Sequence, residues 1–502
     1  MLKTQLNRHE ARFKLLSVIL SSVFYFGIAL IDGPVWCVDT ESYVIMNFSR
    51  EPVYPLFLLG LRRLFDALNI TAQPYNLPAY LTLAIILQSL LWILATCYIG
   101  FYILNITKNL GEKKSIFLSA IAMLCQIGVA GINRFVANRG SMYSESLMTE
   151  SLAMPLYVIF MVLLIKSFDE YNRMTLIKLF LLSILVCSIR KQMLIVLITW
   201  GFASFIFHIF VPKYRDLKKF AVTFIVIVMA FISINLIDCS YNYAIRGVFT
   251  THTGNSKGGL DTLLYTANVD DDQLFADADK DKFPNAVALF DEIYLQCKEL
   301  KLTIDYAPGY ELQEDSSVFN SDWASMAGHY ADSYDVIGFD VVLPILKTYV
   351  ADNFPELDEV HAAIKQDQVE QFLFKTLLKN TLKNVTNGND RGAVYVLTAN
   401  VLKAFVISNA NISPEILIKV SLVIYFIYLV VFIALLLKRK TYSANIAARM
   451  MLIVMAGIAI NSVVTGSMIF PQPRYMCYAM GMFYLALVWG ITELLGRRNA
   501  DR

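Results

Sequence analysis

The stretch LPAYLTLAIILQSLLWILATCYIGFYI, residues 77–103, contains no Asp, Glu, Lys, Arg or His. An α-helix rises about 1.5 Å per residue, so about 20 apolar residues cross the hydrocarbon core of a bilayer, which is roughly 30 Å thick. The stretch exceeds that length and has only a few scattered polar side chains. It therefore predicts a transmembrane helix.

Similar apolar runs recur along the chain, whose 502 residues are 57% hydrophobic and only 17% charged. Soluble globular chains are about 25% charged. The composition therefore indicates an all-α polytopic membrane protein with about ten transmembrane helices. The runs lie at about 15–36, 77–103, 116–132, 152–166, 176–189, 192–211, 220–237, 414–437, 450–470 and 476–495.

The distribution of Lys and Arg predicts the orientation of these helices, because cytoplasmic loops carry an excess of basic residues. Basic residues gather at 3–14, 108–114, 166–178, 213–219, 438–449 and 497–502, which we expect in the cytoplasm together with both chain ends. The extracytoplasmic side then holds 32–76, 133–151, the Arg190–Lys191 corner, 238–413 and 471–475.

Three parts of the chain follow from this pattern. Residues 1–237 form an N-terminal transmembrane module of about seven helices, with the first outer loop at 32–76. Residues 238–413 are polar, rich in acids and too long for a connector. Their helical apolar spacing predicts a small, mainly helical extracytoplasmic domain. Residues 414–502 form a C-terminal transmembrane module of about three helices.

Charged residues gather at the predicted outer ends of the helices. Ionisable groups at membrane depth cost several kcal/mol on many scales, so they usually face a partner, a wet cavity or a substrate. Five outer segments each supply an acid or an arginine, which indicates one polar cavity that opens outward. These residues are Asp39, Glu41, Arg50, Arg134, Arg139, Glu145, Glu150, Arg190 and Arg474.

The acids have two interpretations. Asp39, in WCVDTESY, would accept a proton as a general base, or it would cap a helix with Thr40 and Glu41. Glu41 is either a second site acid or part of that cap. Thr149 and Glu150 open a predicted helix, where they would cap it or project into the cavity.

Glu145 is the weaker of the two acidic candidates in YSESLMTESLAMPL, residues 143–156. The arginines favour phosphate chemistry, because a guanidinium binds phosphate oxygens in a fork and stays charged. Arg190 lies at the outer end of the short run 176–189, and Arg474 lies in the short turn PQPRY. The alternative for both is snorkelling to the membrane interface.

These residues resemble the GT-C glycosyltransferases, multi-helix enzymes that take a sugar from a polyprenyl-phosphate carrier on the extracytoplasmic side. In that family an Asp follows the first helix, and a basic-Pro-x-Tyr-Pro run often comes after it. Here Asp39 precedes Arg50-Glu51-Pro52-Val53-Tyr54-Pro55. Thr149-Glu150 matches the family's second acid, and Arg474-Tyr475 matches an Arg-Tyr pair near the last helix. Members often have Arg-Pro where this chain has Arg190-Lys191.

The resemblance covers about 1–237 and 414–502 and implies a GT-C-like arrangement of the helices. It implies that Asp39 and Glu150 are catalytic, with Asp39 as the base, and that sugar transfer inverts the anomeric centre. Arg190 and Arg474 would hold the carrier phosphate. The other implied substrate-binding residues are Glu41, Arg50, Tyr54, Glu145 and Tyr475.

Some members of the family need Mg²⁺ or Mn²⁺, for which Asp39 and Glu150 would be the ligands. The resemblance implies a polyprenyl-phosphate-linked sugar as donor and a glycan, lipid or protein as acceptor, in assembly or modification of a cell-surface glycan. The amphipathic segment 55–68 would lie along the outer surface of the lipid bilayer.

Two other functions share these features: a lipid-linked glycan polymerase or ligase, and a transporter or lipid flippase. A transporter predicts mid-helix charges and inverted repeats, whereas the charges here cluster at the outer ends. The net charge of +2 gives no indication of nucleic-acid binding. The Lys/Ile/Asn-rich composition indicates a bacterial cytoplasmic membrane.

Overall fold

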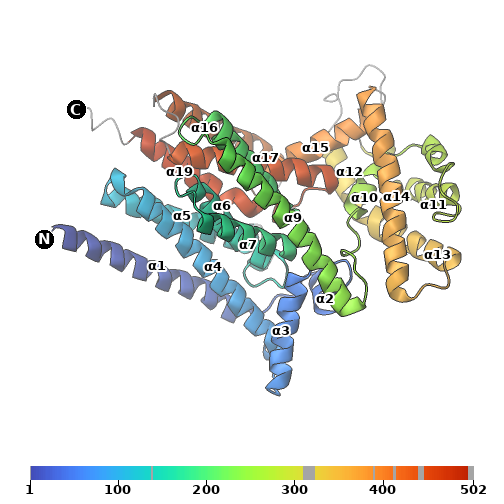
Figure 1. Ribbon diagram of the computed structural model, residues 1–502, viewed down its shortest axis with the longest axis horizontal. Coiled ribbons are helices and arrows are strands. Elements are labelled where there is room, and N and C mark those ends of the chain that lie inside the picture. The colour runs from blue at the N-terminus through green and yellow to red at the C-terminus, as the bar shows by residue number, and fades with distance from the viewer. Residues whose placement is uncertain are drawn as a thin grey trace. The chain divides into compact units, whose positions relative to one another are not determined.

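The computed structural model describes residues 2–136, 140–308, 323–387, 391–410, 414–438 and 446–495. Its regular elements are all helices within those ranges, with one isolated β-bridge between Val35 and Ser146. Arg139 and the basic tail 497–502 lie outside the described residues. The chain forms two compact units (Figure 1).

Unit 1 comprises Met1–Tyr243, Phe405–Asn461 and Pro473–Arg502. Most of its helices are long and apolar. They are α1 (Leu2–Asp32), α2 (Thr40–Val44), α3 (Val53–Ala67), α4 (Ala79–Ile106), α5 (Glu112–Phe135), α6 (Glu150–Ser167), α7 (Arg173–Ile189), α8 (Ile195–Phe205), most of α9 (Leu217–Arg246), α16 (Pro414–Lys438), most of α17 (Ile446–Met468), α18 (Pro473–Met476) and α19 (Met480–Leu495).

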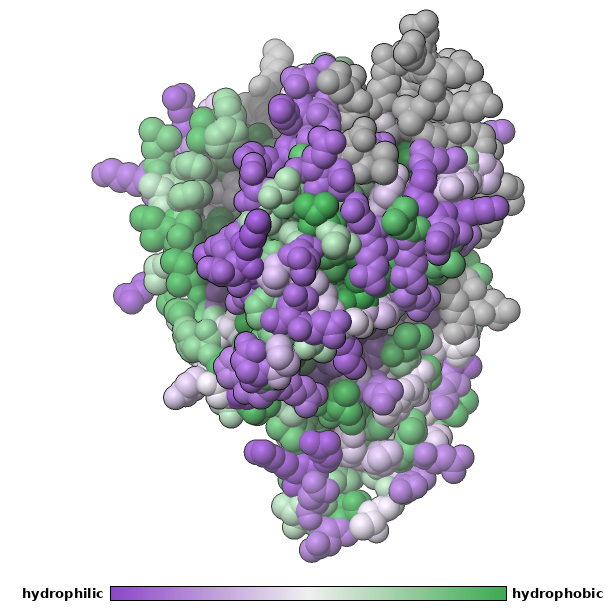
Figure 2. All heavy atoms as spheres, turned by 90° about the vertical axis from the view of Figure 1, so that its right-hand side faces the viewer, coloured by the Kyte–Doolittle hydropathy of each residue, from purple (hydrophilic) through white to green (hydrophobic). Residues whose placement is uncertain are grey.

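Unit 2 comprises Ala244–Ala404 and Ser462–Gln472, and its described residues are mainly helical around a core of aliphatic and aromatic side chains. Its helices are α10 (Lys257–Tyr265), α11 (Ala286–Glu299), α12 (Trp323–Val336), the π-helix η7 (Ile337–Val342), α13 (Leu343–Asn353), α14 (Glu359–Thr386) and most of α15 (Arg391–Ile407). Hydrophilic side chains cover much of the face that Figure 2 shows, with hydrophobic ones among them.

Nine helices in the described part of the chain are long and apolar enough to cross a membrane, so the chain is a multi-pass membrane protein. They correspond to nine of the ten predicted runs. The tenth run, 176–189, forms α7, which has 17 residues and is not among the nine. At about 1.5 Å per residue such a helix spans roughly 26 Å, somewhat less than the hydrocarbon core. The described residues therefore contain nine candidate spans, one fewer than the ten apolar runs that the sequence predicts.

Helix α4, formed by the stretch quoted first, is the centre of unit 1 and contacts α1, α3, α5 and α6. Its scattered polar side chains hold the segment that precedes α6. The buried Gln88 amide donates to the carbonyls of Ser144 and Ser146, at 3.1 Å each, and Trp92 donates to the carbonyl of Ser151 at 2.9 Å. Buried polar groups need such partners. These bonds fix the start of α6, where Glu150 lies.

Candidate active site

Asp39 lies immediately before α2, at the position of a helix cap, but its side chain makes no capping hydrogen bond. The carboxylate instead pairs with two arginines: Oδ1 lies 2.7 Å from Arg50 Nη2, and Oδ2 lies 3.1 Å from Arg474 Nη1. The capping alternative for Asp39 is therefore wrong. Thr40 anchors this turn, because its hydroxyl donates to the carbonyl of Leu147 at 2.8 Å.

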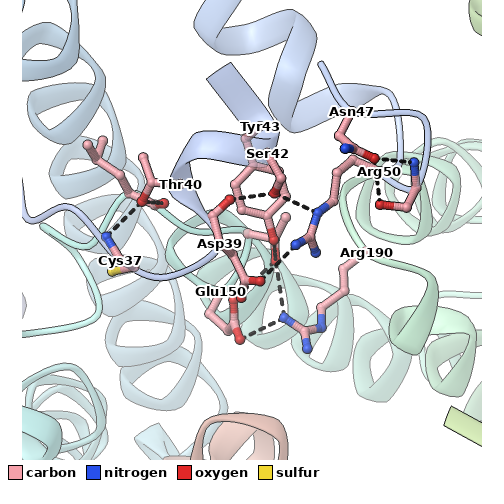
Figure 3. A network of polar contacts seen from close by, with 12 residues as sticks. Cys37, Asp39, Thr40, Ser42, Tyr43, Asn47, Arg50, Glu150 and Arg190 are labelled. Atoms are coloured by element: carbon pink, nitrogen blue, oxygen red, sulfur yellow. Dashed lines mark hydrogen bonds and ion pairs between the residues drawn. The ribbon is translucent and has the colours of Figure 1, made fainter. Parts of the chain in front are cut away.

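Arg50 is held from three directions, as Figure 3 shows. Besides its ion pair with Asp39, its Nε donates to the hydroxyl of Ser42 at 2.8 Å, and its guanidinium lies 4.7 Å from the centre of the Tyr43 ring. Burial raises the pKa of Asp39, but Arg50 and Arg474 lower it more, so the pKa lies below its usual value. Asp39 is therefore ionised at neutral pH.

Glu150 is the first residue of α6, and its side chain is fully buried. Its Oε1 lies 2.6 Å from Arg190 Nη1 and 3.8 Å from Arg474 Nε. Thr149 makes no capping bond; its hydroxyl accepts a hydrogen bond from Arg190 at 3.1 Å. The Thr149 cap is therefore also wrong. The first residue of α6, Glu150, instead places its carboxylate against Arg190 and Arg474.

Arg190 follows α7 in an extended conformation, which turns the chain into the short helix η3 (Lys191–Leu194). The side chain of Gln192 accepts from Arg190 Nε at 3.0 Å and donates to the Tyr475 carbonyl at 3.0 Å. Asn461 donates to the same carbonyl at 2.9 Å. These amides tie Arg190 to the turn that carries Arg474 and Tyr475.

The Tyr475 side chain lies against both arginines. The guanidiniums of Arg190 and Arg474 lie 4.6 Å and 4.9 Å from the centre of its ring, and its hydroxyl accepts from Arg474 Nη2 at 2.8 Å. An aromatic face beside a cation stabilises the charge. Tyr475 therefore contacts both guanidiniums and orients them.

The structure thus brings together five of the predicted site residues from segments far apart in the sequence: Asp39, Arg50, Glu150, Arg190 and Arg474. We call these five the charge cluster. Its three guanidiniums and two carboxylates give one net positive charge. Four of the side chains are between 16% and 27% exposed, while Glu150 is buried. Four of the five side chains can therefore be reached from solvent, whereas Glu150 cannot.

Of the four other predicted site residues, Tyr475 lies against the charge cluster, as described above, and three have other surroundings. Tyr54 is fully buried in α3 and donates to Gln88 Oε1 at 3.0 Å, so it supports α4. Glu41 is exposed on α2. Glu145 is buried, accepts from the Met142 amide at 2.9 Å and lies 3.5 Å from Arg134. Burial raises the pKa of Glu145 to about 7, although the Met142 amide and Arg134 lower it.

Sequence reasoning missed Gln192 and Asn461. Each is an uncharged polar residue in an apolar run, where an amide side chain needs a hydrogen-bonding partner. That signal is present in the sequence but does not say which residue the amide contacts. Glu51 was also missed; its carboxylate accepts from the Lys191 amide at 2.6 Å and ties the first outer loop to the end of α7.

The donor chemistry of the charge cluster does not fit a divalent cation, because Arg474 already lies 3.1 Å from Asp39 and 3.8 Å from Glu150. The described residues contain no group of three or more His, Cys, Asp or Glu that could hold a metal ion.

Comparisons with family models, curated proteins and solved structures found no match to this chain.

Proposed function

We propose that the protein is a membrane glycosyltransferase of the GT-C type, which transfers a sugar from a polyprenyl-phosphate carrier to an acceptor. The observation that carries the proposal is the convergence of Asp39 and Glu150 with three arginines. A carboxylate beside a phosphate-binding site supplies the two parts that such a transfer needs, a base for the acceptor and a cation for the leaving group.

Asp39 is the proposed base. It would take the proton of an acceptor hydroxyl as the hydroxyl oxygen attacks the anomeric carbon. The bond from that carbon to the phosphate oxygen would break, and the phosphate would leave with the bonding electrons. A single displacement of this kind inverts the anomeric centre.

Arg190 and Arg474 are the proposed phosphate ligands, with Glu150 and Tyr475 holding them in place. Arginine forks match phosphate oxygens and remain charged. Arg50 would orient Asp39 through the 2.7 Å ion pair.

The charge of the cluster favours a donor with one phosphate over a diphosphate-linked donor. A phosphodiester carries one negative charge, which equals the net positive charge of the five residues. When Asp39 takes up the proton, the net charge of the cluster rises to about two, while the released phosphate monoester also approaches two negative charges at pH 7. The cluster therefore stabilises the leaving group as its charge develops.

We further propose that the charge cluster faces the extracytoplasmic side of a bacterial cytoplasmic membrane and that the product is a cell-surface glycan. The distribution of basic residues supports this orientation.

The proposal is tested by incubating the full-length protein with polyprenyl-phosphate sugars and membranes that supply the acceptor. We expect the intact protein to release polyprenyl phosphate and the Asp39→Asn variant to lose that activity. Unchanged transfer by Asp39→Asn would exclude the base and favour a polymerase or ligase. No release by the intact protein would favour a transporter.

A further inference from the structure

The two proposed roles of the charge cluster conflict in the arrangement that the structure shows. Arg474 should hold the donor phosphate, yet its Nη1 lies 3.1 Å from Asp39 Oδ2. Asp39 should accept a proton, yet both of its oxygens have ion pairs, with Arg50 and with Arg474. A carboxylate that neutralises two guanidiniums is a weak base. One of these ion pairs must therefore open before the reaction.

The pair between Arg190 and Glu150 is the less able to open. Its atoms are 2.6 Å apart, and the Glu150 side chain is fully buried. Separating the pair would leave a buried charge without its partner, which is strongly unfavourable. The Thr149 hydroxyl and the Gln192 amide also hold Arg190 in this position.

The pair between Arg474 and Asp39 is suited to exchange. It consists of one contact of 3.1 Å, and the two side chains are 27% and 23% exposed. Ion pairs that are accessible to solvent contribute little to stability. Arg474 would keep its bond to the Tyr475 hydroxyl, and Asp39 would keep its 2.7 Å pair with Arg50.

We propose, on the basis of the function proposed above, that Asp39 occupies the phosphate position on Arg474 in the empty enzyme and that the donor's phosphate displaces it. Binding of the donor thereby converts Asp39 from an internal anion into the base. The donor must consequently bind before the acceptor is activated. In the empty enzyme Asp39 is paired with Arg474 and is not available as a base.

The exchange has a direct chemical consequence. Once Oδ2 has lost Arg474 it can accept the proton of the acceptor hydroxyl, while Arg50 keeps Oδ1 in place. The phosphate that replaces the carboxylate adds a negative charge beside Asp39, which increases the proton affinity of Asp39. The proton passes to Oδ2, the acceptor oxygen bonds to the anomeric carbon, and the carrier phosphate leaves with the electron pair.

The experiment measures the dissociation constant of full-length protein for undecaprenyl phosphate in detergent, as a double-mutant cycle of Asp39→Asn and Arg474→Gln. If Asp39 competes for Arg474, Asp39→Asn should tighten binding at least threefold, and Arg474→Gln should weaken it at least tenfold. The tightening by Asp39→Asn should disappear in the Arg474→Gln background. Phosphatidic acid serves as the control lipid.

Matched controls come from α3, where Arg63 and Asp66 are exposed and make no contact with the charge cluster. Asp66→Asn removes one negative charge and should leave binding unchanged, as should Arg63→Gln. Thermal unfolding checks that each variant folds. If Arg474→Gln does not fold, Arg474→Lys replaces it, because lysine keeps the charge but loses the fork.

The outcomes separate this inference from the proposed function. If Arg474→Gln weakens binding but Asp39→Asn does not tighten it, the exchange is wrong and the phosphate site stands. If Asp39→Asn tightens binding equally in both backgrounds, the effect is general electrostatics and the exchange is also wrong. If the intact protein binds undecaprenyl phosphate no better than phosphatidic acid, the proposed function fails and the inference fails with it.

Discussion

The protein buries acidic side chains in both of its units, but their surroundings differ. In unit 1, Asp39 and Glu150 lie against arginines, and the pKa of Asp39 is below its usual value. In unit 2, both oxygens of Asp261 are buried without a hydrogen-bonding partner among the described residues, and Glu370 is also buried. Burial raises the pKa of Asp261 well above its usual value and that of Glu370 to about 7.

The difference between the two regions lies in the cations that face the acids. Burial has the largest effect on Asp261 and raises its pKa; Lys257 lowers the pKa, but Glu370 and Asp335 raise it further. In unit 1 the guanidiniums outnumber the carboxylates and keep Asp39 charged. Burial therefore has opposite outcomes in the two regions, because arginines offset it at Asp39 and no comparable excess of positive charge offsets it at Asp261.

The largest effect should follow from replacing Asp39. Because the proposed base would be lost, Asp39→Asn should reduce the rate of sugar transfer by about 10²- to 10⁴-fold. The melting temperature should change little, since the side chain is partly exposed. The rate of polyprenyl phosphate release measures this effect. If Asp39→Asn keeps more than about a tenth of the activity, Asp39 is not the base, and the contrast between the two units has no bearing on catalysis.

Removal of Arg190 should reduce stability in addition to weakening phosphate binding. Arg190→Gln leaves the buried carboxylate of Glu150 without its closest cation, so unfolding should become easier by about 3–5 kcal/mol. The measurement is chemical unfolding in mixed micelles, with Arg63→Gln as the exposed control. Adding Glu150→Gln to Arg190→Gln should restore most of the stability. A double variant as unstable as the single one would show that the ion pair is not the cause.

The contribution of Glu370 to the stability of unit 2 should decrease as the pH rises. Asp39, whose pKa is lowered, has the opposite pH dependence. The pKa of Glu370 is about 7 in the folded chain and about 4.5 in the unfolded chain, so the folded state binds the proton more tightly. Its contribution to stability is fully present below pH 4.5 and is lost as the pH rises to about 7, by at most about 3 kcal/mol. Hydrogen exchange in α14, corrected for the intrinsic rate, measures the loss.

Glu370→Gln should flatten this pH dependence, because the amide does not titrate. Glu292→Gln on α11, which replaces an exposed acid of unit 2, provides the control. An unchanged pH profile in Glu370→Gln would mean that another group causes the loss of stability.

The smallest effect should come from Glu41. The residue is exposed on α2, two residues after Asp39, but it lies outside the charge cluster. Glu41→Gln should therefore transfer sugar within about twofold of the intact protein, in contrast to Asp39→Asn. A loss of tenfold or more would restore Glu41 as a site acid.

Much of the helical framework could be predicted from the sequence, because apolar runs of bilayer length are a strong local signal. Nine of the ten runs correspond to candidate spans. The short helix α7 was counted because hydrophobicity alone does not show where a helix stops. The chain leaves the helix at Arg190, where the side chain turns towards Glu150.

The charge cluster could be predicted only in part. Charges at the ends of apolar runs are conspicuous in the sequence, which identified Asp39, Glu150, Arg190 and Arg474. Their pairing depends on tertiary structure, so the sequence favoured Glu150 over Glu145 but did not show which arginine each acid contacts. A tyrosine in a Pro-rich turn likewise gives no sign that it will be buried against Gln88, as Tyr54 is.

A structure of the full-length protein with bound polyprenyl phosphate tests the central claim most directly. We expect the phosphate to lie within hydrogen-bonding distance of Arg474 and Arg190, with Asp39 separated from Arg474 but still paired with Arg50. A phosphate bound elsewhere, with the pair of Asp39 and Arg474 intact, would exclude the exchange.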